Sequence, residues 1–254
     1  YGFYVENHGG TLRSVPARPL TFELDLDALA ESITERTRCV LINSPNNPTG
    51  RVYARQELAA LADVLRRASS RFGRPILLVS DEPYRFLAYD QAEVPGIFPL
   101  YEHSVVVSSF SKNLALAGER VGYVAVNPAM PEAARLMEGL VLANRILGFV
   151  NAPAVGQRLL AEALGHGVDV SVYATRRKAM AEVLEAAGFS FSLPQGAFYF
   201  FPRIPRGNDD TAFVRLLMEE RILAVPGSGF GYPGYFRLAF CVDEAVIRGA
   251  AQGF

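Results

Sequence analysis

The sequence contains few of the residues that mark several common classes of protein. It has no tryptophan, three histidines, and two cysteines, Cys39 and Cys241, among 254 residues. Two cysteines cannot build a disulfide framework or a zinc cluster, and the histidines are scattered without metal-ligand spacing, so no metal site is predicted. With no signal-peptide pattern in the opening residues, we expect a reduced, cytoplasmic setting.

An excess of one charge and long apolar runs are also missing. The formal net charge of −1 gives no electrostatic reason for nucleic acid or an anionic membrane as a partner. Charged residues, proline or glycine interrupt the apolar runs well short of the roughly 18 residues of a membrane span. Half of the residues are nevertheless hydrophobic, which is enough for a sizeable core.

Lysine is rare in this chain. Of the 25 basic residues only Lys112 and Lys178 are lysines, and the remainder are arginines. Lys112 follows the apolar run Val105–Val107 and a serine-rich segment. A primary amine can form a Schiff base with a carbonyl and a guanidinium cannot, so a lysine retained here suggests covalent chemistry. The alternative at this point is an ordinary solvated loop lysine.

Short apolar runs alternate with amphipathic stretches in the first half of the chain. Helices are predicted after Asp25 or Asp27 and over residues 55–72. Buried strands are predicted at four places, residues 39–42, 76–79, 105–107 and 121–126. This order predicts an α/β fold with a mostly parallel sheet sandwiched by helices.

The second half of the chain has a more helical pattern. Helices are expected at residues 131–147, 153–164, 169–187 and 211–221, and strands at 189–193, 196–201 and 235–241. The strand at 189–193 rests on the alternation of Phe189 and Phe191 with serines. We therefore predict a large domain over residues 1–165 and a smaller α+β domain over residues 166–254.

Polar side chains follow three of the predicted strands. They are Asn47 after the first, Asp81 and Tyr84 after the second, and Ser109 with Lys112 after the third. The ends of parallel strands lie along one edge of a sheet, where ligands bind in open α/β folds. We therefore expect these residues to converge.

A lysine that forms a Schiff base suggests pyridoxal 5'-phosphate as cofactor. This cofactor needs a carboxylate for its pyridine nitrogen, donors for its ring oxygen and a cradle for its phosphate. Asp81 suits the first need, and the amide of Asn47 and the hydroxyl of Tyr84 suit the second. Taken singly, each has a structural alternative: a cap or turn aspartate, a turn asparagine and a core tyrosine.

Two arginines complete the candidate site. Arg120 can pair with a phosphate in a two-pronged geometry, with Ser109 adding a hydroxyl, although a surface ion pair with Glu119 is the alternative. Arg237 is a lone cation within the apolar strand 235–240. Such an arginine either satisfies a structural partner or, if it points into the cleft, binds a substrate carboxylate.

Taken together, these motifs resemble those of the fold-type I pyridoxal-phosphate enzymes, specifically the class I/II aminotransferases related to aspartate aminotransferase. The matching segments are residues 43–50, 80–84, 109–113 with Arg120, and 236–238. The resemblance implies that Lys112 holds the cofactor and moves the substrate proton, and that Asp81 pairs with the pyridinium nitrogen. It also implies the following binding roles: Asn47 and Tyr84 for the ring oxygen, Ser109 and Arg120 for the phosphate, and Arg237, with Asn47 beside it, for the substrate α-carboxylate.

The implied activity is transfer of an amino group from an amino acid to a 2-oxo acid through a Schiff base on Lys112. A pyridoxal-dependent carbon–sulfur β-lyase shares the motifs, and an aminotransferase-like regulatory domain is a further alternative. The resemblance also implies a homodimer. Family members carry an N-terminal portion that supplies a phosphate loop and a ring-stacking aromatic residue. Tyr1 begins within interior-like sequence, so we expect this chain to be an N-terminally truncated fragment.

Overall fold

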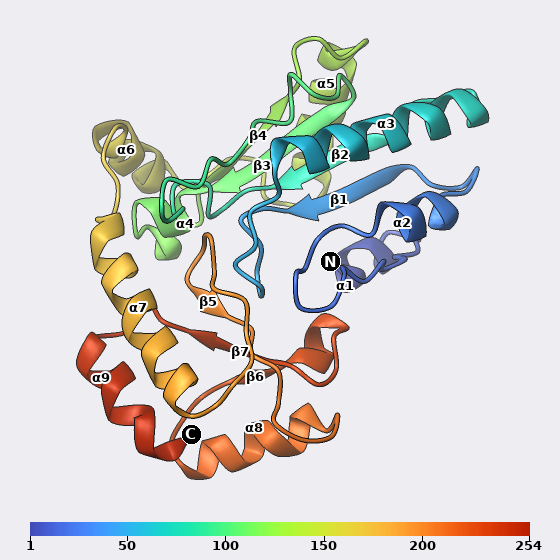
Figure 1. The fold of residues 1–254 in the computed structure, drawn as a ribbon. Coiled ribbons are helices and arrows are strands. Elements are labelled where there is room, and N and C mark those ends of the chain that lie inside the picture. Colours follow the sequence, from blue (N-terminus) through green and yellow to red (C-terminus); the bar gives the residue numbers. More distant parts are fainter.

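The computed structural model describes residues 1–254. Figure 1 shows one sheet with helices around it in the upper part of the view and a second, smaller sheet with its own helices below it. None of the helices is both long and apolar enough to span a membrane.

The larger sheet consists of four strands in sequential order, β1 (Cys39–Asn43), β2 (Leu77–Asp81), β3 (Ser104–Ser109) and β4 (Gly122–Val126). The first three pair in parallel and β4 pairs antiparallel to β3. The prediction of a mostly parallel sheet is confirmed. Because β1, β2 and β3 run in one direction, their carboxyl ends share one edge.

Six helices belong to this half of the chain: α1 (Gly2–Glu6), α2 (Leu26–Ser32), α3 (Arg55–Phe72), α4 (Phe110–Asn113), α5 (Ala133–Ile146) and α6 (Ala154–Ala163). α3 covers one face of the sheet, because the fully buried Leu61 and Leu65 on its apolar stripe pack in one cluster with Ile42 and Leu78 of the strands. It ends at Gly73, which adopts a left-handed conformation (φ 66°). α5 contacts β4.

The smaller sheet has the order β5-β7-β6, with every pairing antiparallel. Its strands are β5 (Tyr199–Phe200), β6 (Val225–Pro226) and β7 (Phe236–Ala239). The helices around it are α7 (Val170–Ala186), α8 (Asp210–Glu219) and α9 (Glu244–Gly249).

The predicted strand over residues 189–193 is wrong. The alternating phenylalanines do face the core, since Phe189 is buried and Phe191 packs against the same apolar cluster. The segment finds no strand to pair with, and only the Ser190 carbonyl accepts a backbone hydrogen bond, from Arg203. The strand expected at 196–201 is likewise shorter and covers Tyr199–Phe200 alone.

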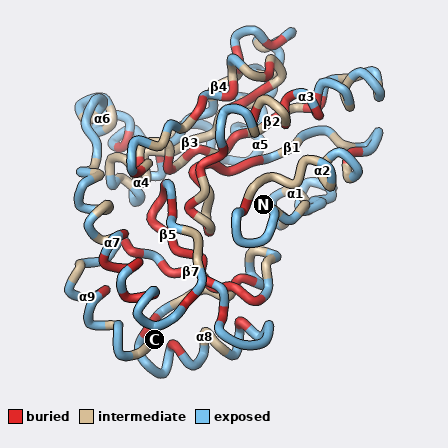
Figure 2. The backbone as a smooth tube through the Cα atoms, viewed as in Figure 1, coloured by how far each residue is buried: buried red, intermediate tan, exposed pale blue.

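The apolar core is divided between the two sheets (Figure 2). One cluster of 12 buried residues lies between α3 and the larger sheet, and another of 20 surrounds the smaller sheet. The latter includes Tyr84, Leu87 and Tyr89, which follow β2 in the first half of the chain. The segment 84–89 therefore joins the edge of one sheet to the core of the other. The domain boundary at residue 165 stays a prediction.

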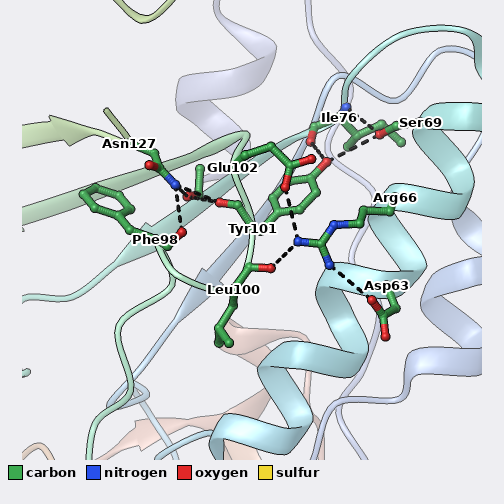
Figure 3. A network of polar contacts seen from close by, with 10 residues as sticks. Asp63, Arg66, Ser69, Ile76, Phe98, Leu100, Tyr101, Glu102 and Asn127 are labelled. Carbon is green, nitrogen blue, oxygen red and sulfur yellow. Dashed lines mark hydrogen bonds and ion pairs between the residues drawn. The ribbon is translucent and has the colours of Figure 1, made fainter. Parts of the chain in front are cut away.

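A polar network ties down the other edge of the larger sheet (Figure 3). The Tyr101 hydroxyl donates to the Ile76 carbonyl at 2.7 Å, and the Asn127 amide donates to the carbonyls of Phe98 and Tyr101, both at 3.0 Å. Tyr101 and Ile76 precede β3 and β2, so this network lies at the amino ends of the strands. Many of its acceptors are backbone carbonyls, so we interpret the network as stabilising the fold.

Candidate active site

The polar residues expected to converge do lie on one edge of the larger sheet. Asn43 and Asp81 are the last residues of β1 and β2 and are paired in register, and Asp81 is paired in turn with Val107 of β3. Ser109 ends β3 and the short helix α4, which carries Lys112, follows at once. Parallel pairing thus gathers three separate segments at the carboxyl ends of the strands.

Asp81 is held by two neighbours. The Asn43 amide donates to its backbone carbonyl at 2.8 Å and reaches its Oδ2 at 3.5 Å, while the Tyr1 hydroxyl donates to Oδ2 at 2.5 Å. Burial raises the pKa of Asp81, and the hydrogen bond from Tyr1 acts in the opposite direction. The carboxylate is thus partly desolvated and oriented, which suits a group that must pair with a buried cation.

Asn47 and Arg237 join the two sheets. Arg237 Nη1, from β7, donates to Asn47 Oδ1 at 2.9 Å. Asn47 is in turn fixed through its backbone nitrogen, which donates to Asn43 Oδ1 at 2.7 Å. In this orientation the Asn47 side-chain nitrogen has no protein acceptor and can donate elsewhere.

Two aromatic rings lie against the Arg237 guanidinium. Its central carbon lies 4.7 Å from the ring centroid of Tyr199 and 5.0 Å from that of Phe230. Phe230 is the last residue of a glycine-rich 3₁₀ helix, Gly227–Phe230, where a side chain on Gly227 would collide with the Tyr232 carbonyl oxygen. The close packing at the start of this helix therefore needs glycine, and the end of the helix places an aromatic ring against Arg237.

Tyr84 faces a second tyrosine. Its hydroxyl lies 2.8 Å from the Tyr199 hydroxyl, and its ring packs edge-on against Tyr199 and Phe198. The pKa of Tyr84 is raised well above its usual value, chiefly by burial and then by the bond with Tyr199. Tyr84 is therefore a protonated hydrogen-bond donor at neutral pH.

Lys112 lies on α4 with its amine near the same aromatic group. Nζ is 5.7 Å from the ring centroid of Phe198, and no carboxylate forms an ion pair with it. An amine against an aromatic face, with no salt-bridge partner, is available for reaction with a carbonyl.

The two residues assigned to the phosphate are less closely tied to the others. The Ser109 hydroxyl makes no capping bond to α4 and is free to donate. Arg120 is exposed, has a left-handed backbone (φ 54°), and donates from Nη1 to the Ala117 carbonyl at 2.9 Å. The alternative ion pair with Glu119 does not form. The structure records no side-chain bond between Arg120 and the remaining site residues.

Sequence reasoning missed four aromatic residues at this site, Tyr1, Phe198, Tyr199 and Phe230. Tyr1 bonds Asp81 across 80 positions and Tyr199 bonds Tyr84 across 115 positions. The aromatic strand around residue 199 was visible in the sequence, but no spacing rule singles out which ring faces the site.

These contacts describe one connected site. Hydrogen bonds connect Asp81 through Asn43 and Asn47 to Arg237. Arg237 in turn contacts the ring of Tyr199, whose hydroxyl is hydrogen-bonded to Tyr84. An amine, a half-buried carboxylate and amide and phenol donors lie at or beyond the strand ends of the parallel sheet, and the guanidinium of Arg237 reaches them from β7 of the smaller sheet. These are the kinds of group that the sequence analysis associated with pyridoxal phosphate.

The chain belongs to the aminotransferase class I and II family, whose model matches residues 1–254. It is 31% identical over 249 residues to an aspartate aminotransferase of Bacillus subtilis, an alignment that covers 91% of this chain and 60% of that protein. The chain thus spans about three fifths of this relative.

Solved structures give the same result. An aminotransferase from Eubacterium rectale has 39% sequence identity and a TM-score of 0.95, over 100% of this chain and 63% of its own. Aspartate aminotransferase from Thermus thermophilus with maleate has 29% identity and a TM-score of 0.86, over 100% of this chain and 66% of its own. The family and its fold are therefore those that the sequence motifs indicated.

Proposed function

We propose that this protein is a pyridoxal-phosphate-dependent aminotransferase that moves an amino group from an amino acid to a 2-oxo acid. The observation that carries the proposal is the convergence of Lys112, Asp81 and Tyr84 at one sheet edge, with Arg237 brought beside Asn47 from the other sheet. The family relationship supports it.

The residues present fit the cofactor. Lys112 has an amine without an ion-pair partner to hold it covalently, and Asp81 has a partly desolvated carboxylate for the pyridine nitrogen. The Tyr84 hydroxyl and the Asn47 amide nitrogen would donate to the ring oxygen, and Ser109 and Arg120 would bind the phosphate. When bound, pyridoxal phosphate supplies an electron sink for the substrate Cα. The chain's own part is to place the substrate and to let the Lys112 amine carry the proton released at Cα.

Both substrates of the proposed reaction carry an α-carboxylate, which we assign to Arg237. Its guanidinium, in contact with two aromatic rings, has the planar donor geometry that a carboxylate accepts. The relative that was solved with maleate, a dicarboxylate, supports a carboxylate as the ligand.

Replacement of Arg237 by alanine is expected to raise KM for the amino donor by about 30-fold to several thousand-fold, because a charge-assisted pair worth roughly 2–5 kcal/mol is lost. Arg203 is exposed on the same half of the chain, so Arg203→Ala is the matched control and keeps the wild-type KM. An Arg237→Ala variant with unchanged KM would refute the assignment. Steady-state kinetics with purified, cofactor-loaded protein measures both.

The assay that tests the function supplies an amino acid with and without a 2-oxo acid. Formation of the new amino acid only when the 2-oxo acid is present supports amino transfer. Release of pyruvate and ammonia from a sulfur-containing amino acid without an acceptor identifies the β-lyase instead. Neither product, from protein that binds the cofactor, favours the regulatory domain.

We also propose a homodimer and a reducing, cytoplasmic location. α5, α6 and their connection expose large apolar side chains, among them Ile146 (74% exposed), Phe149 (72%) and Val155 (68%). A second copy that covers this face removes it from water. Both cysteines are free, as in reduced proteins.

The variant Ile146→Glu places a charge on this apolar face. We expect it to lower the dimer fraction at least about tenfold, as measured by light scattering after size-exclusion chromatography. Leu223→Glu, an exposed apolar position in the other half of the chain (82% exposed), is the control and keeps the dimer. A wild-type monomer, or an Ile146→Glu dimer, would contradict the proposed interface.

A further inference from the structure

Tyr199 touches two residues that have different roles in the proposed site. It lies on β5, in register with Ala239 of β7, and only 7% of its surface is exposed. Its hydroxyl is 2.8 Å from that of Tyr84, and its ring face carries the Arg237 guanidinium at 4.7 Å. Tyr199 thus links the phenol and the guanidinium of the site.

The hydrogen bond between the Tyr84 and Tyr199 hydroxyls must have one direction if Tyr84 is to donate to the cofactor. Either oxygen can be the donor of the bond between them. Tyr84 can donate to a cofactor ring oxygen only if its own proton points away from Tyr199, and then Tyr199 must donate to the Tyr84 oxygen. Burial raises the pKa of Tyr199 as well, so that its proton is present at neutral pH. A hydroxyl that accepts one hydrogen bond is a stronger donor in the next.

The neighbouring guanidinium favours the same direction of the bond. The Arg237 charge lowers the pKa of both phenols, but of the two rings its guanidinium lies over that of Tyr199. A cation over the face of a phenol makes the hydroxyl a better donor and a poorer acceptor. Tyr84 has no side-chain hydrogen-bond partner other than Tyr199. A phenol on β5 is therefore placed to direct the proton of Tyr84, which follows β2.

We propose that Tyr199 is a positioning residue, whose hydroxyl directs the Tyr84 proton toward the ring oxygen of the cofactor while its ring supports Arg237. This inference rests on the proposed function and adds a residue to it. Tyr199 acts through Tyr84, so that removing its hydroxyl has no effect once the Tyr84 hydroxyl is gone.

The test is the pH titration of the visible absorbance of the cofactor-loaded protein. Donation to the ring oxygen favours its anionic form and holds the titration midpoint low. Tyr199→Phe weakens that donation and is expected to raise the midpoint by roughly half a pH unit, and Tyr84→Phe by more. The double variant is expected to match Tyr84→Phe alone. KM for the amino donor stays within about twofold of wild type in Tyr199→Phe, because the ring beneath Arg237 remains.

Tyr89→Phe is the matched control for loss of a buried phenol bond. Tyr89 belongs to the same cluster, is 2% exposed, and donates to the Ala197 carbonyl at 2.7 Å. Tyr89→Phe should lower Tm by about as much as Tyr199→Phe does, without changing the titration midpoint. An unchanged midpoint in Tyr199→Phe, a further shift in the double variant, or an equal shift in Tyr89→Phe would each overturn the proposal. If unaltered protein shows no cofactor absorbance at all, the proposed function itself fails, which is a distinct result.

Discussion

Replacing Lys112 by alanine is expected to lower kcat for amino transfer by about 10³-fold or more. General acid–base catalysis by a positioned side chain contributes roughly 10²–10⁴-fold, and Lys112 provides the covalent attachment in addition. No neighbouring group can replace it, because the only other lysine, Lys178, is an exposed residue of α7. The measurement is kcat for formation of the new amino acid.

The scarcity of lysine provides an unusually clean control. Lys178→Ala removes the only other side-chain amine and is expected to keep the wild-type kcat. Lys112→Arg keeps the positive charge but cannot form a carbon–nitrogen double bond with an aldehyde, so it is expected to be as inactive as the alanine variant. Substantial activity in Lys112→Arg would show that the residue supplies only charge.

Asp81→Asn is expected to lower kcat by about 10²–10³-fold, the usual cost of removing one electrostatic group aimed at developing charge. The carboxylate keeps the pyridine nitrogen protonated, and a neutral amide does not. The Tyr1 hydroxyl can still donate to the side-chain amide oxygen of this variant, so the geometry is kept and charge alone is altered. Asp63→Asn, an exposed position on α3, is the control. A kcat within threefold of wild type in Asp81→Asn would remove Asp81 from the mechanism.

Asp81→Asn is also expected to raise the Tm of the cofactor-free protein. Burial raises the pKa of Asp81 in the folded state, so the charged form is disfavoured on folding. A raised acid pKa costs stability above that pKa, and the cost disappears as pH falls through it. The gain in Tm should thus be present at neutral pH and shrink in acid. A rise in Tm together with a fall in kcat would identify Asp81 as a residue that serves function at the expense of stability.

The sequence alone predicts where the polar residues that follow strands lie. Asp81, Lys112 and Asn47 were predicted because apolar runs reveal buried strands, and parallel pairing then places the strand ends together. The amphipathic helix α3 was predicted to the residue, since its stripe and its terminal glycine are local signals.

What could not be predicted depends on contacts between distant segments. The bonds from Tyr199 to Tyr84 and from Tyr1 to Asp81 follow from how the two sheets and the first helix pack, and no local pattern encodes them. The strand expected at 189–193 failed for a related reason. Alternation shows which side chains face the core, but a strand also needs a neighbour to pair with, and Phe189 and Phe191 pack without one.

Reduction with borohydride, followed by mass spectrometry, tests the central claim most directly. Borohydride reduces the double bond between a lysine nitrogen and the cofactor aldehyde and so makes the attachment permanent. We expect the yellow protein to lose its visible absorbance and the cofactor mass to appear on the peptide that contains Lys112, with none on the peptide of Lys178. The adduct on any other residue, or no adduct on protein that has bound the cofactor, would contradict the account.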